Sequence, residues 1–241
     1  SLMLSAQISD WGGIGVTLPV VPDNPEQLQS SIKKATTNYD LVIVNAGSSA
    51  GAKDYTMQAI DSLGTVIVHG VAIKPGHPVI LGIVNKKPVI GLPGYPVSTI
   101  MTSELFLKPI IEKALRLPSL TSHKVKATLT RKLVSQFGSD EFVRLRLARI
   151  RGELAATAIQ RGAGVIMSLV EADGITKIPK LSEGIDAGTE IEVKLIKHID
   201  EINNTLVMVG SHDLTIDILS NLLKQQTLKS KIASSNIGSI A

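Results

Sequence analysis

Two short segments rich in proline and glycine contain the residues with the clearest chemical meaning in this chain. The first is Lys74-Pro75-Gly76-His77-Pro78, and the second is Gly91-Leu92-Pro93-Gly94-Tyr95-Pro96. Because proline fixes φ and glycine permits a positive φ or close approach of the backbone, each segment predicts stiff turns beside a hydrophobic strand. Lys74 adds a cation to the first segment. The combination is typical of a site that holds a bulky anionic ligand against rigid backbone.

Polar residues in and near these segments are the next candidates, and each has a structural alternative. Lys74 is restricted in direction by the Pro-Gly pair after it, and the alternative is an ordinary surface lysine. A lone histidine such as His77 is most often structural or solvated. Ser98 either caps a helix or donates to an anion, and Arg144, on a predicted strand, either binds a ligand or faces water. The ligand-binding candidates in these parts of the sequence are Lys74, Pro75, Gly76, His77, Pro93, Gly94, Pro96, Ser98 and Arg144.

A loop of small residues, Gly47-Ser48-Ser49-Ala50-Gly51, lies between a predicted buried strand and a predicted helix. Such a loop lets backbone N–H groups converge, and the helix N-terminus adds partial positive charge, which suits a phosphate or another oxyanion. It is not a Walker A loop, because the glycine spacing differs and Asp54 follows Lys53. A tight strand-to-helix turn with hydroxyl caps explains the same residues equally well.

Two aspartates are candidates for a metal site. Asp54 falls in the first turn of the helix after the glycine loop, where it either complements the helix dipole or ligates Mg²⁺ together with phosphate oxygens. Asp23 precedes another helix, where a turn or cap residue is the alternative. Ligands of open α/β sheets bind in the crevice at the carboxyl ends of the strands. We therefore expect Asp23, Asp54 and the glycine loop to converge there.

Composition narrows the classes of function. The chain has 241 residues, enough for one large or two ordinary domains. Aromatic residues make up 3% and the net charge is +4, so neither base stacking nor a dense basic stripe predicts a nucleic-acid partner. The absence of cysteine excludes thiol catalysis and disulfides and fits a reducing cytoplasm. No apolar run is long enough for a membrane span, and no signal peptide precedes the first helix.

The first half of the sequence alternates between helix and strand patterns, which predicts an α/β layered sheet. Asn24 is the expected cap of a helix that begins at Pro25. A wholly apolar run at 40–44 is typical of a strand covered on both faces. The expected helices are one through Leu2, Leu4 and Ile8, and others at 25–37, 54–63 and 97–115. The expected strands are 15–21, 40–44, 65–71, 79–84 and 88–91, with a turn at Asn85-Lys86-Lys87.

The pattern changes after a linker at 118–123. Alternating runs at 124–131, 142–150, 154–159 and 191–196 predict a small antiparallel β-domain, either a barrel or a two-layer roll. From about Leu206 a strand, a helix and another strand follow in turn. Because one such unit cannot bury both faces of its own sheet, we expect it to begin a further domain. Both ends of the sequence look cut, so the chain is expected to be a fragment.

The order and spacing of these segments resemble the molybdopterin molybdotransferase family, of the MoeA and gephyrin E-domain type, over residues 1 to about 197. The resemblance implies a three-layer molybdopterin-binding (MogA-like) α/β domain at 1–117 that lacks its first strand, and a small β-barrel domain at 118–198. The tail at 199–241 resembles the start of a truncated periplasmic-binding-protein-like domain. The matching motifs are Asp23-Asn24-Pro25, Asp54-Tyr55, Lys74-Pro75-Gly76, Gly91-Leu92-Pro93-Gly94 with Pro96 and Ser98, and Phe142 with Arg144.

The resemblance also implies an activity. The family transfers molybdenum from molybdate to adenylylated molybdopterin and releases AMP, with Mg²⁺ or a similar ion. Asp23 and Asp54 then match the metal-binding carboxylates, and Asp54 and Lys74 are the catalytic candidates. Lys74, Ser98 and Arg144 match groups that bind molybdate or the pterin phosphate. A homodimer in the cytoplasm is implied, with adenylyl-molybdopterin and molybdate or tungstate as its small-molecule partners and with no nucleic acid or membrane partner. The fragment alone is expected to be inactive.

Several departures from the family pattern keep other functions open. The usual Gly-Gly-x-Ser-x-Gly loop reads Asn45-Ala46-Gly47-Ser48-Ser49-Ala50-Gly51, and His77 replaces a second lysine. A serine usual near Ala163 is absent, although Ser168 is close. These changes bear on oxyanion affinity and on the choice between molybdate and tungstate. The alternatives are a non-catalytic module that binds or senses pterin, molybdate or tungstate, and a protein scaffold, since fold does not fix function.

Overall fold

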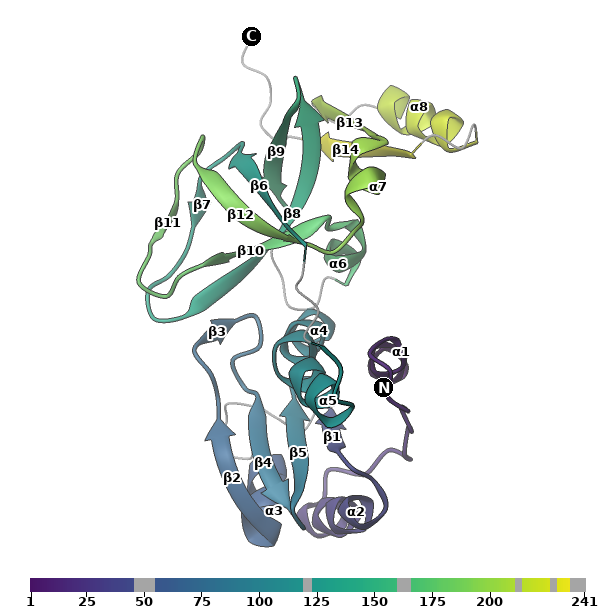
Figure 1. Cartoon of the computed structure of the whole chain (residues 1–241), viewed down its shortest axis with the longest axis vertical. Coiled ribbons are helices and arrows are strands. Elements are labelled where there is room, and N and C mark those ends of the chain that lie inside the picture. Colours follow the sequence, from purple (N-terminus) through teal and green to yellow (C-terminus); the bar gives the residue numbers. More distant parts are fainter. Residues whose placement is uncertain (46–54, 119–122, 160–165, 211–213, 226–228, 235–241) are drawn as a thin grey trace.

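The computed structural model describes residues 1–45, 55–118, 123–159, 166–210, 214–225 and 229–234. An α/β domain occupies one end of the elongated molecule and a β-barrel the other, with the chain's last strand–helix–strand unit beside the barrel (Figure 1). The predicted fold class, an α/β domain followed by a small barrel, is confirmed.

The sheet of the α/β domain has the strand order β1-β5-β4-β2. Strands β1 (Val42–Asn45) and β5 (Lys87–Leu92) are parallel, whereas β4 (Ile80–Val84) is antiparallel to both β5 and β2 (Gly64–His69). The sheet is therefore mixed. The predicted turn after β4 is confirmed, and Asn85 and Lys86 have φ of 50° and 61°, as a tight hairpin requires.

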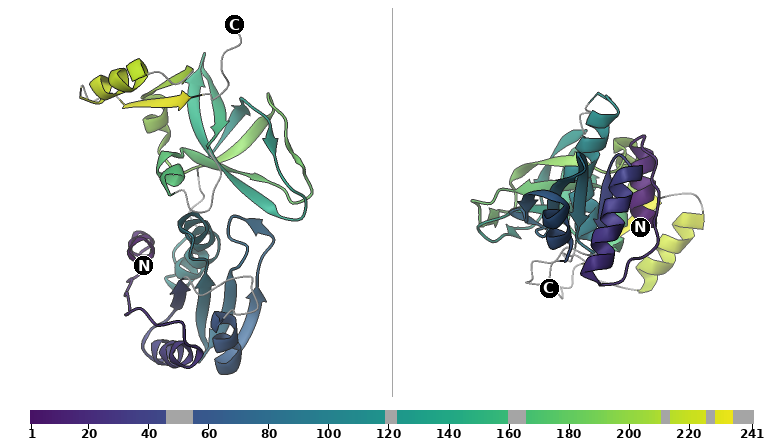
Figure 2. Two further views of the ribbon diagram at one scale, coloured as in Figure 1. Left: turned by 180° about the vertical axis from the view of Figure 1, so that it is seen from behind. Right: turned by 90° about the horizontal axis from the view of Figure 1, so that it is seen from below.

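Helices cover both faces of this sheet (Figures 1 and 2). On one face lie α2 (Pro25–Asn38) and α3 (Tyr55–Leu63), and on the other lie α1 (Leu2–Asp10), α4 (Pro96–Thr102) and α5 (Lys108–Ala114). A separate hydrophobic core fills each interface, so the domain has three layers. The buried residues of the first core are Ile32, Ala35, Val42, Ala59, Ile60, Ile80, Val84 and Val89. Those of the second are Leu4, Val79, Ile90, Leu92, Leu107 and Ile111.

The start of α2 follows directly from its sequence. The Asn24 side chain accepts a hydrogen bond of 2.9 Å from the Gln27 N–H, and Pro25 occupies the first helical position. This is an N-cap that satisfies one of the free N–H groups of the first turn. The predicted cap and helix are confirmed.

The long helix predicted at 97–115 is wrong in one respect, because it is not regular throughout. A π-helical segment, η1 (Ser103–Leu107), separates α4 from α5. Pro109 occupies the first turn of α5 and has no N–H group, so it cannot donate the bond that would continue a regular α-helix toward residue 105. The helix widens immediately before this proline.

The strand predicted at 15–21 is also wrong, because the structure assigns no strand there. The apolar side chains that alternate along this segment face solvent rather than a paired strand. Alternation predicts extended backbone; it does not supply the neighbouring strand with which such backbone must form hydrogen bonds. The exposed side chains are those of Ile14, Val16, Leu18 and Val20.

The barrel closes through the strand order β10-β12-β6-β9-β8, with a further pairing of β8 to β10. The buried residues of its hydrophobic core are Ala127, Leu129, Leu133, Val143, Leu145, Leu147, Ala156, Ile178, Ile191, Val193 and Ile202. The pairing of β6 with β9 is parallel, so the expected antiparallel domain is in fact mixed. The strands are β6 (Lys124–Leu129), β8 (Asp140–Ile150), β9 (Glu153–Ala158), β10 (Gly174–Ile178) and β12 (Glu190–Leu195).

Short elements complete the barrel. Strands β7 (Leu133–Val134) and β11 (Gly184–Ile185) form a small antiparallel ribbon at its edge. Helix α6 (Met167–Glu171) packs on β8, and α7 (Ile199–Asn203) contributes Ile202 to the barrel core.

The predicted final strand–helix–strand unit is confirmed. Strands β13 (Thr205–Gly210) and β14 (Lys229–Ser234) are parallel, and α8 (Leu214–Gln225) connects them. Ser220 of α8 is buried, whereas Leu214, Ile218 and Leu222 remain exposed. Across the part of the chain that the structure describes, no helix is both long and apolar enough to cross a bilayer.

Candidate functional site

The loop that carries Lys74 leaves its own domain and joins the sheet of the barrel. Strand β3 (Ile73–Lys74) pairs in parallel with β8, with Ile73 opposite Asp140 and Lys74 opposite Glu141. The N–H group of Asp140 also donates a hydrogen bond of 2.8 Å to the Ala72 carbonyl. Figure 1 shows this loop rising from the α/β domain to the barrel. The exposed Lys74 is thereby brought to the strand that carries Arg144.

The rest of the loop is fixed from within. The Val71 N–H donates to the His77 carbonyl at 2.9 Å, and the His77 Nδ1 atom lies 2.7 Å from the Val71 carbonyl oxygen. Because a carbonyl oxygen can only accept, Nδ1 carries a proton and the Nε2 atom is left for other contacts. His77 itself is exposed. His77 thus stabilises the loop through its contacts with Val71 and also presents a polar group to solvent.

Gly76 links the same loop to helix α4. Its φ is 113°, and a Cβ atom at this position would lie 2.5 Å from the Thr102 Cγ2 atom. The Lys74–Pro75 peptide bond before it is cis. Both the φ angle and the close contact require glycine, as the Pro-Gly pattern predicted.

The second proline–glycine segment forms the start of α4. Pro93 is buried at the end of β5, Gly94 is exposed, and Pro96 takes the first helical position. Ser98 is buried in the first turn, and its carbonyl accepts a hydrogen bond of 2.7 Å from the Thr102 hydroxyl. Since Thr102 also contacts Gly76, the two predicted segments are adjacent in space.

Arg144 lies on β8, with a relative exposure of 4%. It is paired with Ile175 of β10, and its carbonyl accepts a hydrogen bond from the Ile159 N–H at 3.0 Å. The alternative that Arg144 is an outward-facing solvated charge is therefore wrong. Ser168, in α6, is likewise buried next to this strand. The candidate site thus extends from α4 and the Lys74 loop to the β8–α6 side of the barrel.

Several charged residues of this region were not found from the sequence. Glu141, opposite Lys74, is buried and accepts a hydrogen bond of 2.8 Å from the Ser135 hydroxyl. Asp173 is fully buried, accepts from the Leu147 N–H at 2.9 Å and lies 3.3 Å from the Lys197 ammonium. No local pattern marks these carboxylates. The Asp173 partners, Leu147 and Lys197, lie in distant segments, and the Ser135 that pairs with Glu141 is only six residues away but has no recognisable spacing signal.

Asp140 has the clearest electrostatic signature near the site. Its Oδ1 atom accepts a hydrogen bond of 2.8 Å from the Lys180 N–H, and its Oδ2 atom lies 3.3 Å from the Lys177 ammonium. These interactions lower the pKa of the Asp140 carboxyl, with the Lys180 backbone bond as the largest cause. The carboxylate is therefore ionised and fixed.

A second contact joins the two domains. Glu104, in the π-helical segment, lies 3.3 Å from the Lys194 ammonium of β12 and 3.7 Å from that of Lys108. The α/β domain thus contacts the barrel through backbone at β3 and through an ion pair at Glu104.

The structure describes only part of the predicted metal site. Asp23 lies in an exposed bend before α2. Asp54 and the loop from Gly47 to Gly51, including Ser48 and Ser49, lie outside the described residues, so the expected convergence stays a prediction. Within the described ranges there is no group of three or more His, Cys, Asp or Glu residues that could hold a metal ion.

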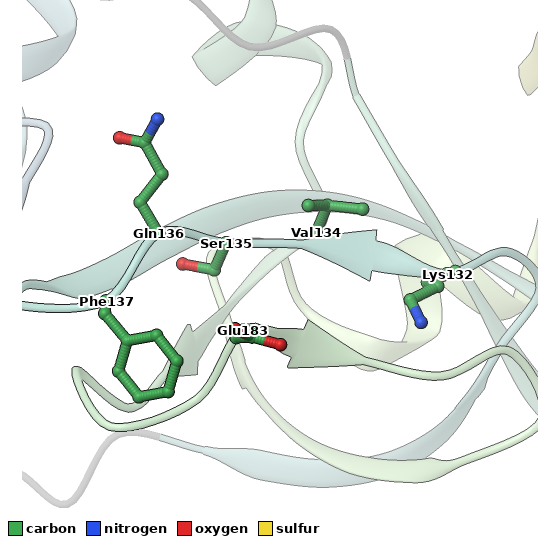
Figure 3. Close-up of a pocket in the computed structure, with 6 residues that line it drawn as sticks. All are labelled: Lys132, Val134, Ser135, Gln136, Phe137 and Glu183. Atoms are coloured by element: carbon green, nitrogen blue, oxygen red, sulfur yellow. The ribbon is translucent and has the colours of Figure 1, made fainter.

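A hollow on the barrel lies beside the β7–β11 ribbon (Figure 3). Two of its polar side chains have partners: the Ser135 hydroxyl donates to Glu141, and the Lys132 ammonium lies 2.9 Å from the Asp186 carboxylate. No predicted site residue lines it. The lining residues are Lys132, Val134, Ser135, Gln136, Phe137 and Glu183.

Two family models match this arrangement of domains. The model described as "Probable molybdopterin binding domain" matches residues 1–113, and the MoeA C-terminal region (domain IV) matches residues 126–196. The chain thus combines a molybdopterin-binding domain with a MoeA C-terminal domain. The family matches end before the final strand–helix–strand unit, so the resemblance of that unit to a periplasmic-binding-protein-like domain stays a prediction.

Individual MoeA relatives agree with this assignment. A molybdopterin biosynthesis protein of Methanocaldococcus jannaschii is 34% identical over 198 residues, which cover 82% of this chain and 46% of the relative. Molybdopterin molybdenumtransferase 2 of Mycobacterium tuberculosis is 31% identical over 203 residues, or 80% and 49% of the two chains. A solved MoeA structure from Pyrococcus horikosii matches with a TM-score of 0.68 at 36% identity, over 82% of this chain and 47% of that one. The chain spans about half the length of these relatives.

Proposed function

We propose that this chain takes part in inserting molybdenum from molybdate into adenylylated molybdopterin, with release of AMP, as part of molybdenum cofactor biosynthesis. The observation that carries the proposal is the pairing of β3 with β8, which brings Lys74 of one domain to the strand of Arg144 in the other. The names of the relatives, among them molybdopterin molybdenumtransferases, support the reaction class.

The side chains suit an oxyanion. Molybdate is a tetrahedral dianion, so cations and hydrogen-bond donors must replace its hydration shell when it binds. Lys74 has an exposed ammonium group, whereas the Arg144 guanidinium and the Ser98 hydroxyl at the start of α4 belong to buried residues. We assign anion binding to these residues, with Lys74 as the catalytic candidate.

We also assign Mg²⁺ binding to Asp23 and Asp54. Mg²⁺ is commonly held by one or two carboxylates together with substrate phosphate oxygens and water. The exposed Asp23 carboxylate before α2 fits such a shared site. When bound, Mg²⁺ would neutralise charge at the phosphoanhydride that is cleaved.

The remaining parts of the proposal are a homodimer and a cytoplasmic location. Both rest on the family resemblance. Sedimentation analysis of the full-length protein tests the first, and cell fractionation tests the second.

The experiment that tests the function measures AMP release from adenylylated molybdopterin by the full-length protein, with and without molybdate. We expect molybdate-dependent release, and we expect Lys74→Ala and Asp54→Ala to abolish it. Lys86→Ala, which removes an exposed cation in the β4–β5 turn, is the matched control and should retain activity. Unchanged AMP release in both Lys74→Ala and Asp54→Ala would contradict the proposal.

A second candidate function is a non-catalytic module that binds or senses pterin, molybdate or tungstate. The presence of His77 where the family pattern has a second lysine favours it, because the loop then carries one cation fewer when the imidazole is neutral. Calorimetry separates the two functions. Tight molybdate or tungstate binding without AMP release would support the binding module.

A further inference from the structure

The start of β8 is the point at which the barrel holds the Lys74 loop. The Asp140 N–H donates to the Ala72 carbonyl at 2.8 Å, and Asp140 is the register partner of Ile73. Lys74 is the next residue along the loop. The backbone position of Asp140 therefore determines where the barrel places the residue before Lys74.

The side chain of Asp140 fixes that backbone position from the other side. Its carboxylate accepts from the Lys180 N–H at 2.8 Å and lies 3.3 Å from the Lys177 ammonium. The Gly138 N–H in turn donates to the Lys180 carbonyl at 2.9 Å, so two hydrogen bonds join Lys180, after β10, to Gly138 and to Asp140 at the start of β8. A charged acceptor makes this link stronger than a neutral one.

We propose that Asp140 is a positioning residue for Lys74: its carboxylate fixes the start of β8, and its N–H group transmits that position to the loop. The proposal rests on the function assigned to Lys74 above. Asp140 does not touch the anion in this scheme. It acts by limiting how far the Lys74 loop can move relative to the strand of Arg144.

The test compares Asp140→Ala, Asp140→Asn and Asp186→Ala. Alanine removes the acceptor for the Lys180 N–H, whereas asparagine keeps a carbonyl oxygen there and loses only the charge. Asp186 is an exposed barrel carboxylate that pairs with Lys132 away from β3, so its loss is the matched control.

Two readouts are measured on the full-length protein: amide exchange of residues 72–76 and of Lys180, and the molybdate dependence of AMP release. For Asp140→Ala we expect faster exchange at both places and a KM for molybdate that rises about tenfold, with a smaller change in kcat. Asp140→Asn should restore exchange protection and KM to within about twofold of wild type, and Asp186→Ala should match wild type.

The outcomes separate this proposal from the proposed function. If residues 72–76 exchange equally in wild type and in folded Asp140→Ala, the positioning role is overturned. If Asp140→Ala does not fold, Asp140→Asn decides. A raised KM for molybdate together with wild-type exchange protection of residues 72–76 then overturns the proposal. A wild-type KM together with wild-type protection of this loop supports it. If wild type releases no AMP, the function fails, and loop exchange alone still decides whether Asp140 holds the loop.

Discussion

Gly76 packs against Thr102 so closely that a Cβ atom on Gly76 would lie 2.5 Å from the Thr102 Cγ2 atom. The φ of Gly76, 113°, is also a conformation that other residues rarely adopt. We therefore expect Gly76→Ala to lower the free energy of unfolding by about 1–3 kcal/mol. Urea unfolding of the two proteins measures this difference.

Thr102→Ser separates the two causes of the destabilisation expected for Gly76→Ala, which are the close contact with Thr102 and the φ angle of Gly76. Serine keeps the hydroxyl that donates to the Ser98 carbonyl and removes only the methyl group that meets position 76. The cost of Gly76→Ala should therefore be smaller in the Thr102→Ser background, and the remainder should reflect the φ angle. Equal costs in both backgrounds would show that the contact with Thr102 does not matter.

Asp173 provides a prediction for the barrel. Asp173→Ala leaves the buried Leu147 N–H without its acceptor, so we expect a loss of about 1–3 kcal/mol in unfolding free energy beyond that of Asp173→Asn, which can still accept this bond. Both variants lose the charge that faces Lys197. Urea unfolding compares them, and amide exchange at Leu147 should be fast only in the alanine variant. Equal stability of the two variants would contradict this role.

The pH dependence of Asp140 follows from its hydrogen bonds. Its pKa in the folded protein is lowered from 3.8, so the ionised carboxylate stabilises the fold above about pH 3.8, and this contribution is lost as the pH falls through the lower folded value. The stability difference between wild type and Asp140→Asn should thus be present at pH 7 and disappear in strong acid. Urea unfolding across this range measures it.

The contributions of Lys180 and Lys177 to the lowered pKa of Asp140 can be separated by experiment. The Lys180 backbone bond is the largest cause of the lowered pKa, ahead of Lys177. We expect Lys177→Met to raise the Asp140 pKa only part of the way back toward 3.8 in an NMR titration of its carboxyl carbon. A full return to 3.8 would assign the effect to Lys177 instead.

His77 is an exposed residue of the Lys74 loop. Replacing it with lysine would place a second ammonium group in this loop, so His77→Lys should tighten molybdate binding at pH 8, measured by calorimetry. The same change removes the hydrogen bond to the Val71 carbonyl, so amide exchange in the loop should become faster. Unchanged affinity would mean that residue 77 does not face the anion.

Sequence periodicity and turn residues were enough to predict most of the helices and strands. Asn24-Pro25 marked the start of α2, and Asn85-Lys86 marked the hairpin. The two-residue strand β3 is too short to show any period, and its partner belongs to the other domain. The segment at 15–21 shows the reverse case, in which a clear strand pattern has no paired strand in the described structure.

In the candidate site, too, features set by local sequence could be predicted and features set by distant packing could not. The Lys74 loop was predictable because proline and glycine report local backbone constraints. The burial of Arg144 depends on how β8 packs, which its own sequence does not show. Asp140 and Glu141 were missed because a carboxylate has no recognisable role until its partners, Lys180 and Ser135, are known.

Strand β3 also restricts how this protein can be recombined with its relatives. The residues of β3 are encoded with the α/β domain, but the sheet that they extend is that of the barrel. A chimera that joins the first domain of one homologue to the barrel of another would create a mismatched edge at residues 72–74 and 140–141. Transplanting the barrel successfully therefore requires that the donor's β3 segment be moved with it.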